Sequence, residues 1–381
     1  MNSALTTVLT IALFAAFALI PFRPRRSSPF TIPFALGWWM NEAPIIGLWW
    51  LMAGTLATLL NPQPGFWWAL IAVGSALVAA MLGWILLRAG STRRTLSTAL
   101  QDVYGPRGEV PRRVPPWWRI VLLPIVSWRP DVRRIRNRRY GPARIGNLLD
   151  VYVPRRGTRA TPAPVLVYFH GGGLAGFGWG GKSIFAHAMM YRLAARGWVC
   201  ISANYRMYGV RYSDQLADAH DALGWAREHA GEFGGDPDAV FATGGSSGAH
   251  LAATAALTGA RVRGAVPLYA YYGPAGGGAG EVTSPHDAIN ADAPPFLIVP
   301  GAQDANIPLK DSRAFAAHLR AVSRNPVVYA ELPGANHNFD FFPSWRMAVV
   351  SDAVQRFGEL VLEGDASATP RRLAERTVRT D

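Results

Sequence analysis

Residues 239–248 read Ala-Val-Phe-Ala-Thr-Gly-Gly-Ser-Ser-Gly, an apolar run that ends in the pattern G-x-S-x-G. The apolar run predicts a buried strand, and the residues from Gly248 to Leu257 predict a helix. The glycines between them permit a sharp turn that lifts Ser246 above the sheet at the amino end of the helix, where the peptide dipole favours negative charge. This register predicts Ser246 as a nucleophile and the backbone N–H of Ser247 as a donor to an oxyanion.

A second glycine-rich segment lies upstream, where the apolar run Val165–Phe169 is followed by His170-Gly171-Gly172-Gly173. Three glycines after a strand let backbone N–H groups turn toward a ligand without obstruction by a Cβ atom. An H-G-G-G loop and a G-x-S-x-G turn supply complementary parts of one acyl-transfer site, so the pair is more specific than either motif alone. We expect His170 to order this loop rather than to act as a base.

The partners of such a serine are expected further along the chain, in the order acid and then histidine. Asp304 follows the apolar run Phe296–Val299, and His337 follows Val327–Leu332. Each therefore occupies a loop directly after a predicted strand. Because ligands bind at the carboxyl ends of the strands in parallel sheets, we expect both side chains at the same edge as Ser246.

Short β-rich runs alternate with helical runs from Asn147 onward, which predicts an α/β fold with a mostly parallel central sheet flanked by helices. The predicted strands are Leu149–Val153, Val165–Phe169, Trp198–Ala203, Ala239–Thr243, Val262–Tyr269, Phe296–Val299 and Val327–Leu332. The predicted helices are Ser183–Arg196, Ser213–Glu232, Gly248–Leu257, Leu309–Val322 and Trp345–Leu362.

With these motifs the chain resembles the α/β-hydrolase esterase and lipase family, in the branch that has HGG-type oxyanion loops. It is especially similar to the membrane-associated carboxylesterases and lipases of mycobacteria and related actinobacteria. The resemblance runs from about Tyr140 to Leu362 and extends weakly upstream to Gly37-Trp38-Trp39. It implies Ser246 as nucleophile, Asp304 as acid and His337 as base. The implied oxyanion donors are the backbone N–H groups of Gly172, Gly173 and Ser247, in a loop supported by His170 and Gly171.

Two stretches depart from the pattern of this family. Relatives often have Ala-Gly-Gly-His after the nucleophile, whereas this chain has Ser247-Gly248-Ala249-His250. Their His-Gly before the acid loop is Pro300-Gly301 here. Neither change removes a side chain that the chemistry needs, although Ser247 could narrow an acyl pocket.

The implied reaction is hydrolysis of a carboxylic ester through an acyl-enzyme, which needs no metal and no organic cofactor. The same residues could serve an amidase, an arylformamidase or a peptidase, so these activities stay open. A catalytically silent membrane scaffold with this fold is an alternative of another class. A weak further alternative is nucleotide binding, because Gly176–Ser183 matches the P-loop pattern G-x-x-x-x-G-K-S.

The composition and the apolar runs of the chain also predict a membrane-spanning region. Half of the 381 residues are apolar and 17% are charged, which excludes a disordered chain, and a single cysteine excludes a disulfide scaffold. Three uncharged apolar runs lie in residues 1–88: Ala4–Ile20, Ala43–Leu60 and Phe66–Leu87. Each is long enough to cross a hydrocarbon core, so we predict a three-span transmembrane region. A cleaved signal peptide is the alternative for the first run.

The net charge of +13 is concentrated near these runs, because residues 1–150 hold 17 arginines against five acidic residues. Arginines after the first and third runs predict that the amino terminus lies outside and that everything after Arg88 is cytoplasmic, in an integral protein of the plasma membrane. The tryptophan-rich segment within residues 89–145 predicts a partly interfacial stretch that binds anionic lipid headgroups. A plain solvated linker is the alternative for this segment. No nucleic-acid-binding motif accompanies the charge, so we expect no nucleic acid partner.

These observations divide the chain into four parts. Residues 1–88 are the predicted transmembrane region, and residues 89–145 are a basic linker that could also cover the active site. Residues 146–363 are the predicted hydrolase domain, and residues 364–381 are a predicted disordered tail. The expected partners are an ester or acyl substrate and a lipid bilayer.

Overall fold

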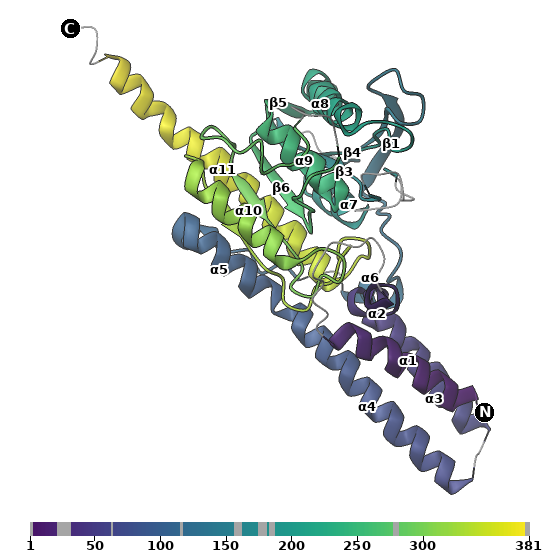
Figure 1. Ribbon diagram of the computed structural model, residues 1–381. Coiled ribbons are helices and arrows are strands. Elements are labelled where there is room, and N and C mark those ends of the chain that lie inside the picture. Colours follow the sequence, from purple (N-terminus) through teal and green to yellow (C-terminus); the bar gives the residue numbers. More distant parts are fainter. Residues whose placement is uncertain are drawn as a thin grey trace.

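An eight-stranded sheet forms the centre of the carboxyl-terminal part of the chain, with the strand order β1-β2-β4-β3-β5-β6-β7-β8 (Figure 1). The structure is a computed structural model that describes residues 3–20, 32–61, 64–114, 117–155, 162–173, 181–182, 187–276 and 282–377. The strands are β1 (Val132–Arg139), β2 (Leu148–Pro154), β3 (Ala163–Phe169), β4 (Val199–Ala203), β5 (Gly235–Gly245), β6 (Gly264–Leu268), β7 (Phe296–Ile298) and β8 (Val327–Tyr329).

Strands β3 to β8 pair in parallel, and only β1 and β2 are antiparallel to their neighbours. The central strands consist mostly of apolar residues that are buried on both faces, which is typical of a parallel sheet covered by helices on both sides. The structure therefore confirms the predicted α/β fold. Because β3, β5, β7 and β8 run in the same direction, the loops that follow them lie at one edge of the sheet.

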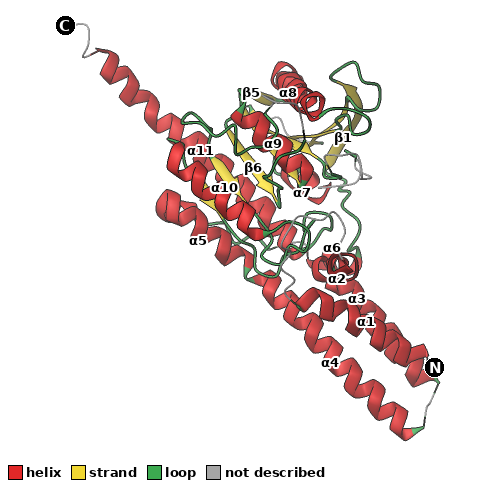
Figure 2. Cartoon of the chain, viewed as in Figure 1, coloured by secondary structure: helices red, strands yellow, loops and turns green. Residues whose placement is uncertain are grey.

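Helices cover both faces of this sheet (Figure 2). One face is packed against α7 and α11, and the other is packed against α8, α9 and α10. The helices of this part, with one 3₁₀ turn, are α7 (His187–Ala194), α8 (Tyr212–His229), η2 (Ala230–Phe233), α9 (Ser247–Leu257), α10 (Leu309–Val322) and α11 (Trp345–Thr377).

Two elements upstream of residue 146, the predicted start of the hydrolase domain, pack with the sheet in the structure. Strand β1 extends the sheet at its edge and pairs with β2. Helix α5 (Thr92–Tyr104) buries Leu96 and Leu100 in the core that α11 also lines. The sequence of β1 is rich in arginine and therefore did not predict a strand. An edge strand can have such a sequence, because it pairs on one side only and tolerates charged side chains. The remaining elements of residues 89–145 are η1 (Gly105–Gly108) and α6 (Trp117–Leu122).

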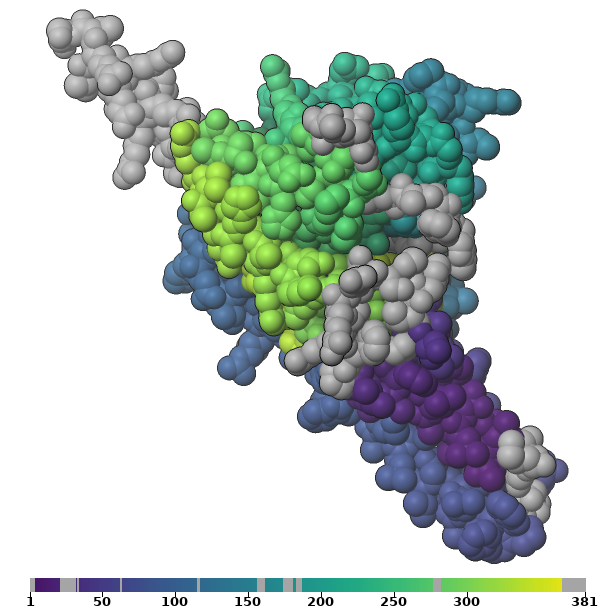
Figure 3. All heavy atoms as spheres, in the orientation of Figure 1, coloured from purple at the N-terminus to yellow at the C-terminus, as the bar shows by residue number. Residues whose placement is uncertain are grey.

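The three apolar runs form long helices that project away from the sheet (Figures 1 and 3). They are α1 (Ser3–Leu19), α3 (Pro44–Leu60) and α4 (Gly65–Gly90), which pack on one another around a small apolar core. A shorter helix, α2 (Ile32–Glu42), precedes α3 at the end nearest the sheet. Many large apolar side chains of α3 and α4 stay exposed, among them Leu56, Leu77 and Leu87.

By length and apolarity, one helical stretch among the described residues could cross a membrane, namely Gly65–Gly108, which comprises α4, α5 and η1. Helices α2 and α3 meet that criterion only when counted together as one span bent by 90°, and α1 is shorter. The predicted transmembrane region is therefore supported for the third apolar run. For the first two runs it stays a prediction, and Arg23, Arg25 and Arg26 lie outside the described residues.

The predicted disordered tail from residue 364 differs from the structure, in which α11 continues as a helix to Thr377. Alanines, arginines, a leucine and a glutamate beyond residue 364 favour a helix, whereas Pro370 within the same stretch opposes it. The last four residues lie outside the described part of the chain.

The packing of α5 gives a test of its place in the hydrolase body. Replacing the fully buried Leu96 or Leu100 with alanine leaves a cavity under α11 and should cost about 2–5 kcal/mol. The same change at Val103, which is partly exposed on the same helix, should cost no more than about 0.5 kcal/mol. Thermal denaturation of the full chain in detergent measures the difference, and equal midpoints for all three variants would contradict the packing described here.

Candidate active site

Ser246 occupies the strained turn that the G-x-S-x-G pattern predicts. It lies between the end of β5 and the start of α9, with φ of 55° and ψ of −119°. A Cβ atom at Gly248 would lie 2.1 Å from the carbonyl oxygen of Phe169, so only glycine allows the helix to approach β3 this closely. Strain of this kind is stored where the surrounding structure holds it, as at the nucleophile turn of hydrolases.

His337 connects Ser246 to Asp304. Its Nε2 atom lies 2.9 Å from Ser246 Oγ, and its Nδ1 atom lies 2.8 Å from Asp304 Oδ2. The second carboxylate oxygen of Asp304 accepts the backbone N–H groups of Asn306 and Ile307, each at 2.8 Å. Both His337 and Asp304 are buried, whereas Ser246 stays partly exposed. The structure thus brings the three predicted residues together from the loops after β5, β7 and β8.

Asn336, which the sequence reasoning did not select, ties the acid and histidine loops to each other. Its side-chain oxygen accepts the backbone N–H of Ala305 at 3.0 Å and that of His337 at 2.7 Å. The loops also form a parallel bridge between Gly301 and Leu332. The relative positions of the carboxylate and the imidazole are therefore set by hydrogen bonds as well as by the sheet.

The predicted oxyanion loop lies beside the serine. Gly172 and Gly173 have φ values of 142° and 86°, which side-chain-bearing residues rarely adopt. The backbone N–H of Gly173 donates to Ser247 Oγ at 3.1 Å, so this predicted donor already has a partner. The N–H of Ser247 lies in the first turn of α9, where backbone donors have no partner within the helix.

His170, for which we predict a supporting role in this loop, contacts Tyr205. Its ring stacks on Tyr205 with centroids 4.7 Å apart, and the hydroxyl of Tyr205 donates to the carbonyl oxygen of His170 at 2.9 Å. Burial lowers the pKa of His170 to about 4, so its ring is neutral near pH 7. A neutral ring bonded to its own loop fits a supporting role.

A buried carboxylic acid, Asp340, is linked to His337 through Tyr269. The sequence patterns did not indicate it. Asp340 accepts hydrogen bonds from the hydroxyls of Tyr168, at 2.8 Å, and Tyr269. The ring of Tyr269 contacts the ring of His337 edge-on, with centroids 4.8 Å apart. Burial raises the pKa of Asp340 above its ordinary value, although the two hydroxyls oppose this shift. In the sequence, only the closeness of Asp340 to His337, three residues away, relates it to the site.

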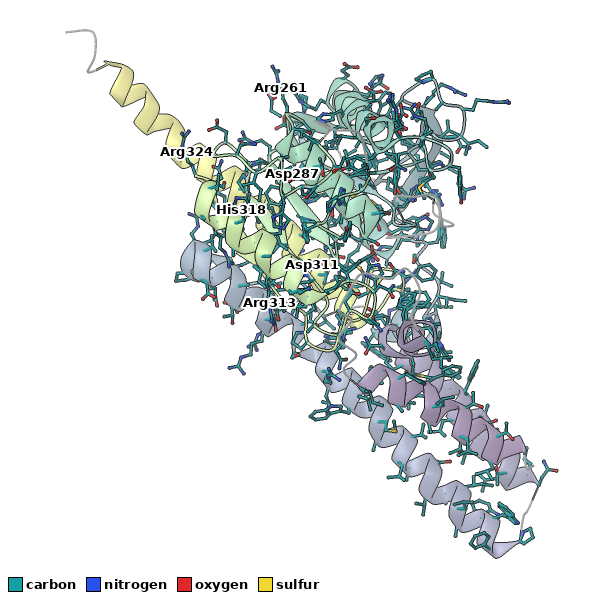
Figure 4. The ribbon with its side chains drawn as sticks, viewed as in Figure 1. Arg261, Asp287, Asp311, Arg313, His318 and Arg324 are labelled. Carbon is teal, nitrogen blue, oxygen red and sulfur yellow. The ribbon has the colours of Figure 1, made fainter. Side chains whose placement is uncertain are left out.

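Two further histidines have side-chain partners outside the Ser–His–Asp contacts. His250 is buried, its Nδ1 atom lies 2.9 Å from the carbonyl oxygen of Tyr271, and burial lowers its pKa to about 4. His318 is exposed on α10 (Figure 4) and stacks loosely on His286. Within the described part of the chain, no group of three or more histidine, cysteine, aspartate or glutamate side chains could hold a metal ion.

The lysine of the P-loop-like pattern is engaged elsewhere. Lys182 forms a buried ion pair with Asp150 on β2, and Arg134 on β1 bonds the same carboxylate at 2.5 Å. Burial favours the neutral form of Asp150, but hydrogen bonds from these cations outweigh it and lower its pKa. A P-loop lysine must reach the phosphates of a nucleotide, so this ion pair argues against nucleotide binding. Residues 176–180 and 183 of the pattern lie outside the described residues.

A mostly parallel sheet with serine, histidine and aspartate in contact at the carboxyl edge defines an α/β-hydrolase. The BD-FAE family model matches residues 149–271. The chain is 35% identical to the probable carboxylic ester hydrolase LipM of Mycobacterium tuberculosis over 57% of this chain and 59% of that protein. It is 32% identical to esterase LipC of the same organism over 60% of this chain and 67% of that protein.

The fold also resembles a solved esterase. Thermogutta terrifontis esterase 2, in a form phosphorylated by paraoxon, superposes with a TM-score of 0.50 and 26% identity, over 62% of this chain and 95% of that one. The chain spans about three fifths of the length of LipM and of esterase LipQ, which is another relative. The chain belongs to the α/β-hydrolase carboxylesterase family.

The buried ion pair gives a pH-dependent prediction. Because the folded-state pKa of Asp150 lies below its ordinary value of 3.8, its carboxylate stabilises the fold above about pH 4. That contribution is lost as the pH falls through the lowered folded-state pKa. Asp150→Asn should therefore cost about 3 kcal/mol at pH 7, because it removes the carboxylate that Lys182 and Arg134 share.

Thermal denaturation of both proteins between pH 3 and pH 8 measures this effect. The gap between their midpoints should shrink as the pH falls below about 4. A gap that is constant across the range would show that the charge of Asp150 has no part in stability.

Proposed function

We propose that this protein is a membrane-anchored serine hydrolase that cleaves carboxylic esters. The observation that carries the proposal is the chain of contacts from Ser246 through His337 to Asp304, at 2.9 Å and 2.8 Å. Family membership supports the ester as substrate, because LipM, LipQ and LipC are named as ester hydrolases or esterases.

In the proposed mechanism His337 Nε2 accepts the proton of Ser246 as its oxygen attacks the ester carbonyl carbon. Asp304 holds the imidazole through Nδ1 and stabilises its cationic form. The protonated His337 then donates to the departing alkoxide, which leaves as an alcohol. Water attacks the acyl-enzyme with His337 again as base, which releases the acid and restores Ser246.

The negative oxygen of each tetrahedral intermediate needs hydrogen-bond donors. The backbone N–H groups of Gly172 and Ser247 are the proposed donors, and that of Gly173 joins them if it leaves Ser247 Oγ. One such donor is worth roughly 10²–10³ in rate. Ser247 also holds the loop in place through its hydroxyl, which is 3.3 Å from that of Tyr205.

The membrane anchor is supported by the apolar helices. Helix α4 carries exposed apolar side chains along its length, which suits a lipid environment. The carboxyl end of α4 and the amino end of α3 lie on the side of the sheet, and the other ends of these two helices lie far from it (Figure 1). This arrangement agrees with a catalytic body on the cytoplasmic side, next to Arg88.

The tryptophan-rich segment around α6 is proposed to lie in the headgroup layer. Trp117, Trp118 and Trp128 are exposed, with Arg119 and Arg129 nearby in the sequence. The indole N–H of Trp49, near the start of α3, donates to the carbonyl oxygen of Val121 at 2.9 Å. This contact holds the segment close to the end of an apolar helix, where anionic headgroups would meet its arginines.

The nucleophile is tested by Ser246→Ala. This variant should lose p-nitrophenyl ester hydrolysis by about 10⁴-fold or more, because removing the serine abolishes the covalent route. It should also lose labelling by a fluorophosphonate, whereas Ser247→Ala, which keeps the nucleophile, should still be labelled. Retained labelling or turnover in Ser246→Ala would contradict the assignment.

A further inference from the structure

Helix α2, which lies far from the hydrolase motifs in the sequence, packs against the catalytic histidine. The ring of Phe34 lies edge-on to the ring of His337, with centroids 6.0 Å apart. Phe34 in turn packs on Trp38 of the same helix at 5.6 Å. Phe34 is therefore a buried side chain from outside the sheet that contacts a member of the Ser–His–Asp chain.

The same helix donates hydrogen bonds to the loop that carries His337. The indole N–H of Trp38 donates to the carbonyl oxygen of Asn338 at 3.2 Å. The side-chain amide of Asn41 donates to the carbonyl oxygen of Gly334 at 2.6 Å. Trp38 also packs on Phe341 and Phe342, with centroids 5.1 Å and 5.4 Å away. The loop is thus held by α2 on both sides of the histidine.

A buried ion pair fixes the end of α2 to the hydrolase body. Glu42 is the only acidic residue among residues 1–101, and both of its carboxylate oxygens lie 2.6 Å from one guanidinium nitrogen of Arg346 at the start of α11. Their side chains are 0% and 1% exposed. The Arg346 guanidinium also donates to the carbonyl oxygen of Pro333 at 3.3 Å. Removing one partner of such a buried pair is strongly destabilising, so the pair fixes this junction.

The acid loop has a similar attachment to the amino-terminal helices. The side-chain amide of Gln303, next to Asp304, donates to the carbonyl oxygen of Leu19 at the end of α1 at 3.2 Å. Helix α2 itself lies close against α1, because a Cβ atom at Gly37 would be only 2.7 Å from the backbone of Phe17. The loops of both the acid and the histidine are therefore bonded to the apolar helices.

We infer that α2 is a positioning element of the active site, through which the docked amino-terminal helices hold His337 in line with Ser246. This inference rests on the proposed function. Trp38, Glu42 and Arg346 are positioning residues, because they act on the histidine loop and do not touch the reacting atoms. Since α2 lies between two apolar helices, displacing those helices from the hydrolase body would displace His337 as well.

The physical basis is the short reach of proton transfer. His337 Nε2 must stay within hydrogen-bond distance of Ser246 Oγ while Nδ1 stays bonded to Asp304. A displacement of about 1 Å can cost 10²-fold in rate without preventing substrate binding. Weakening α2 should therefore lower kcat and the rate of serine labelling, while KM changes little.

The first test compares Trp38→Phe with Trp84→Phe in the full chain. Trp38→Phe keeps an aromatic ring but removes the N–H that bonds Asn338, whereas Trp84 is exposed on α4. We expect kcat per titrated active site to fall about tenfold in Trp38→Phe, the equivalent of one lost hydrogen bond. KM should stay within about twofold, and Trp84→Phe should match the wild type. Equal kcat in both variants would overturn the inference.

The second test separates positioning from folding. Glu42→Gln leaves Arg346 buried without its charge partner and should lower both the melting temperature and kcat. The double variant Glu42→Gln/Arg346→Met removes both charges, so its melting temperature should recover. Its kcat per active site should stay about 10²-fold low, because the junction no longer fixes the loop. Recovery of kcat together with the melting temperature would show that the pair is merely structural.

The two proposals fail in different ways. If the wild-type chain neither hydrolyses esters nor reacts with a fluorophosphonate, the proposed function itself is wrong. If the wild type does both, and Trp38→Phe and the double variant keep its kcat, the proposed function is upheld and the positioning role of α2 is wrong.

Discussion

The imidazole of His337 contacts Ser246 through one nitrogen and Asp304 through the other, and much of the structure serves to make these two contacts possible at once. The three side chains come from loops after β5, β7 and β8, and a parallel sheet is the arrangement that brings such loops to one edge. Asn336 joins the acid and histidine loops, and the backbone N–H groups after Asp304 hold its carboxylate. The strained backbone of Ser246 completes the alignment from the other side.

Much of this arrangement could be predicted from the sequence, because each candidate residue follows directly after an apolar run. Runs of that length become buried strands, and the carboxyl ends of parallel strands meet. Once the G-x-S-x-G and H-G-G-G patterns marked two of the loops, the places for an acid and a histidine were limited to the remaining ones. The fold was predictable for the same reason.

What could not be predicted depends on contacts between distant parts of the chain. Trp38 and Asn338 are 300 residues apart, and no periodicity in α2 indicates which of its aromatic residues will meet the histidine loop. Asp340 looks like any polar residue in a loop until the fold places two tyrosine hydroxyls against it. Strand β1 was not predicted, because its many arginines leave no alternation of apolar and polar residues in the sequence.

The fold gives some arginines of residues 1–150 a different role from the one that the sequence predicted. The sequence suggested that the arginines of residues 1–150 face lipid headgroups and that the hydrolase domain after them is nearly neutral. In the structure, Arg134 pairs with Asp150 and Arg93 pairs with Asp352, so part of this charge neutralises buried carboxylates of the hydrolase body. The arginines around α6 remain available to a membrane surface in our proposal. The boundary between anchor and enzyme is therefore less sharp than the composition indicated.

The most direct measurement is to locate the covalent adduct on the full-length protein after reaction with paraoxon or a fluorophosphonate. Digestion and mass spectrometry should find one modified residue, Ser246, with the extent of modification proportional to the loss of ester hydrolysis. Modification of another residue in proportion to the loss, or full inhibition with Ser246 unmodified, would contradict the account.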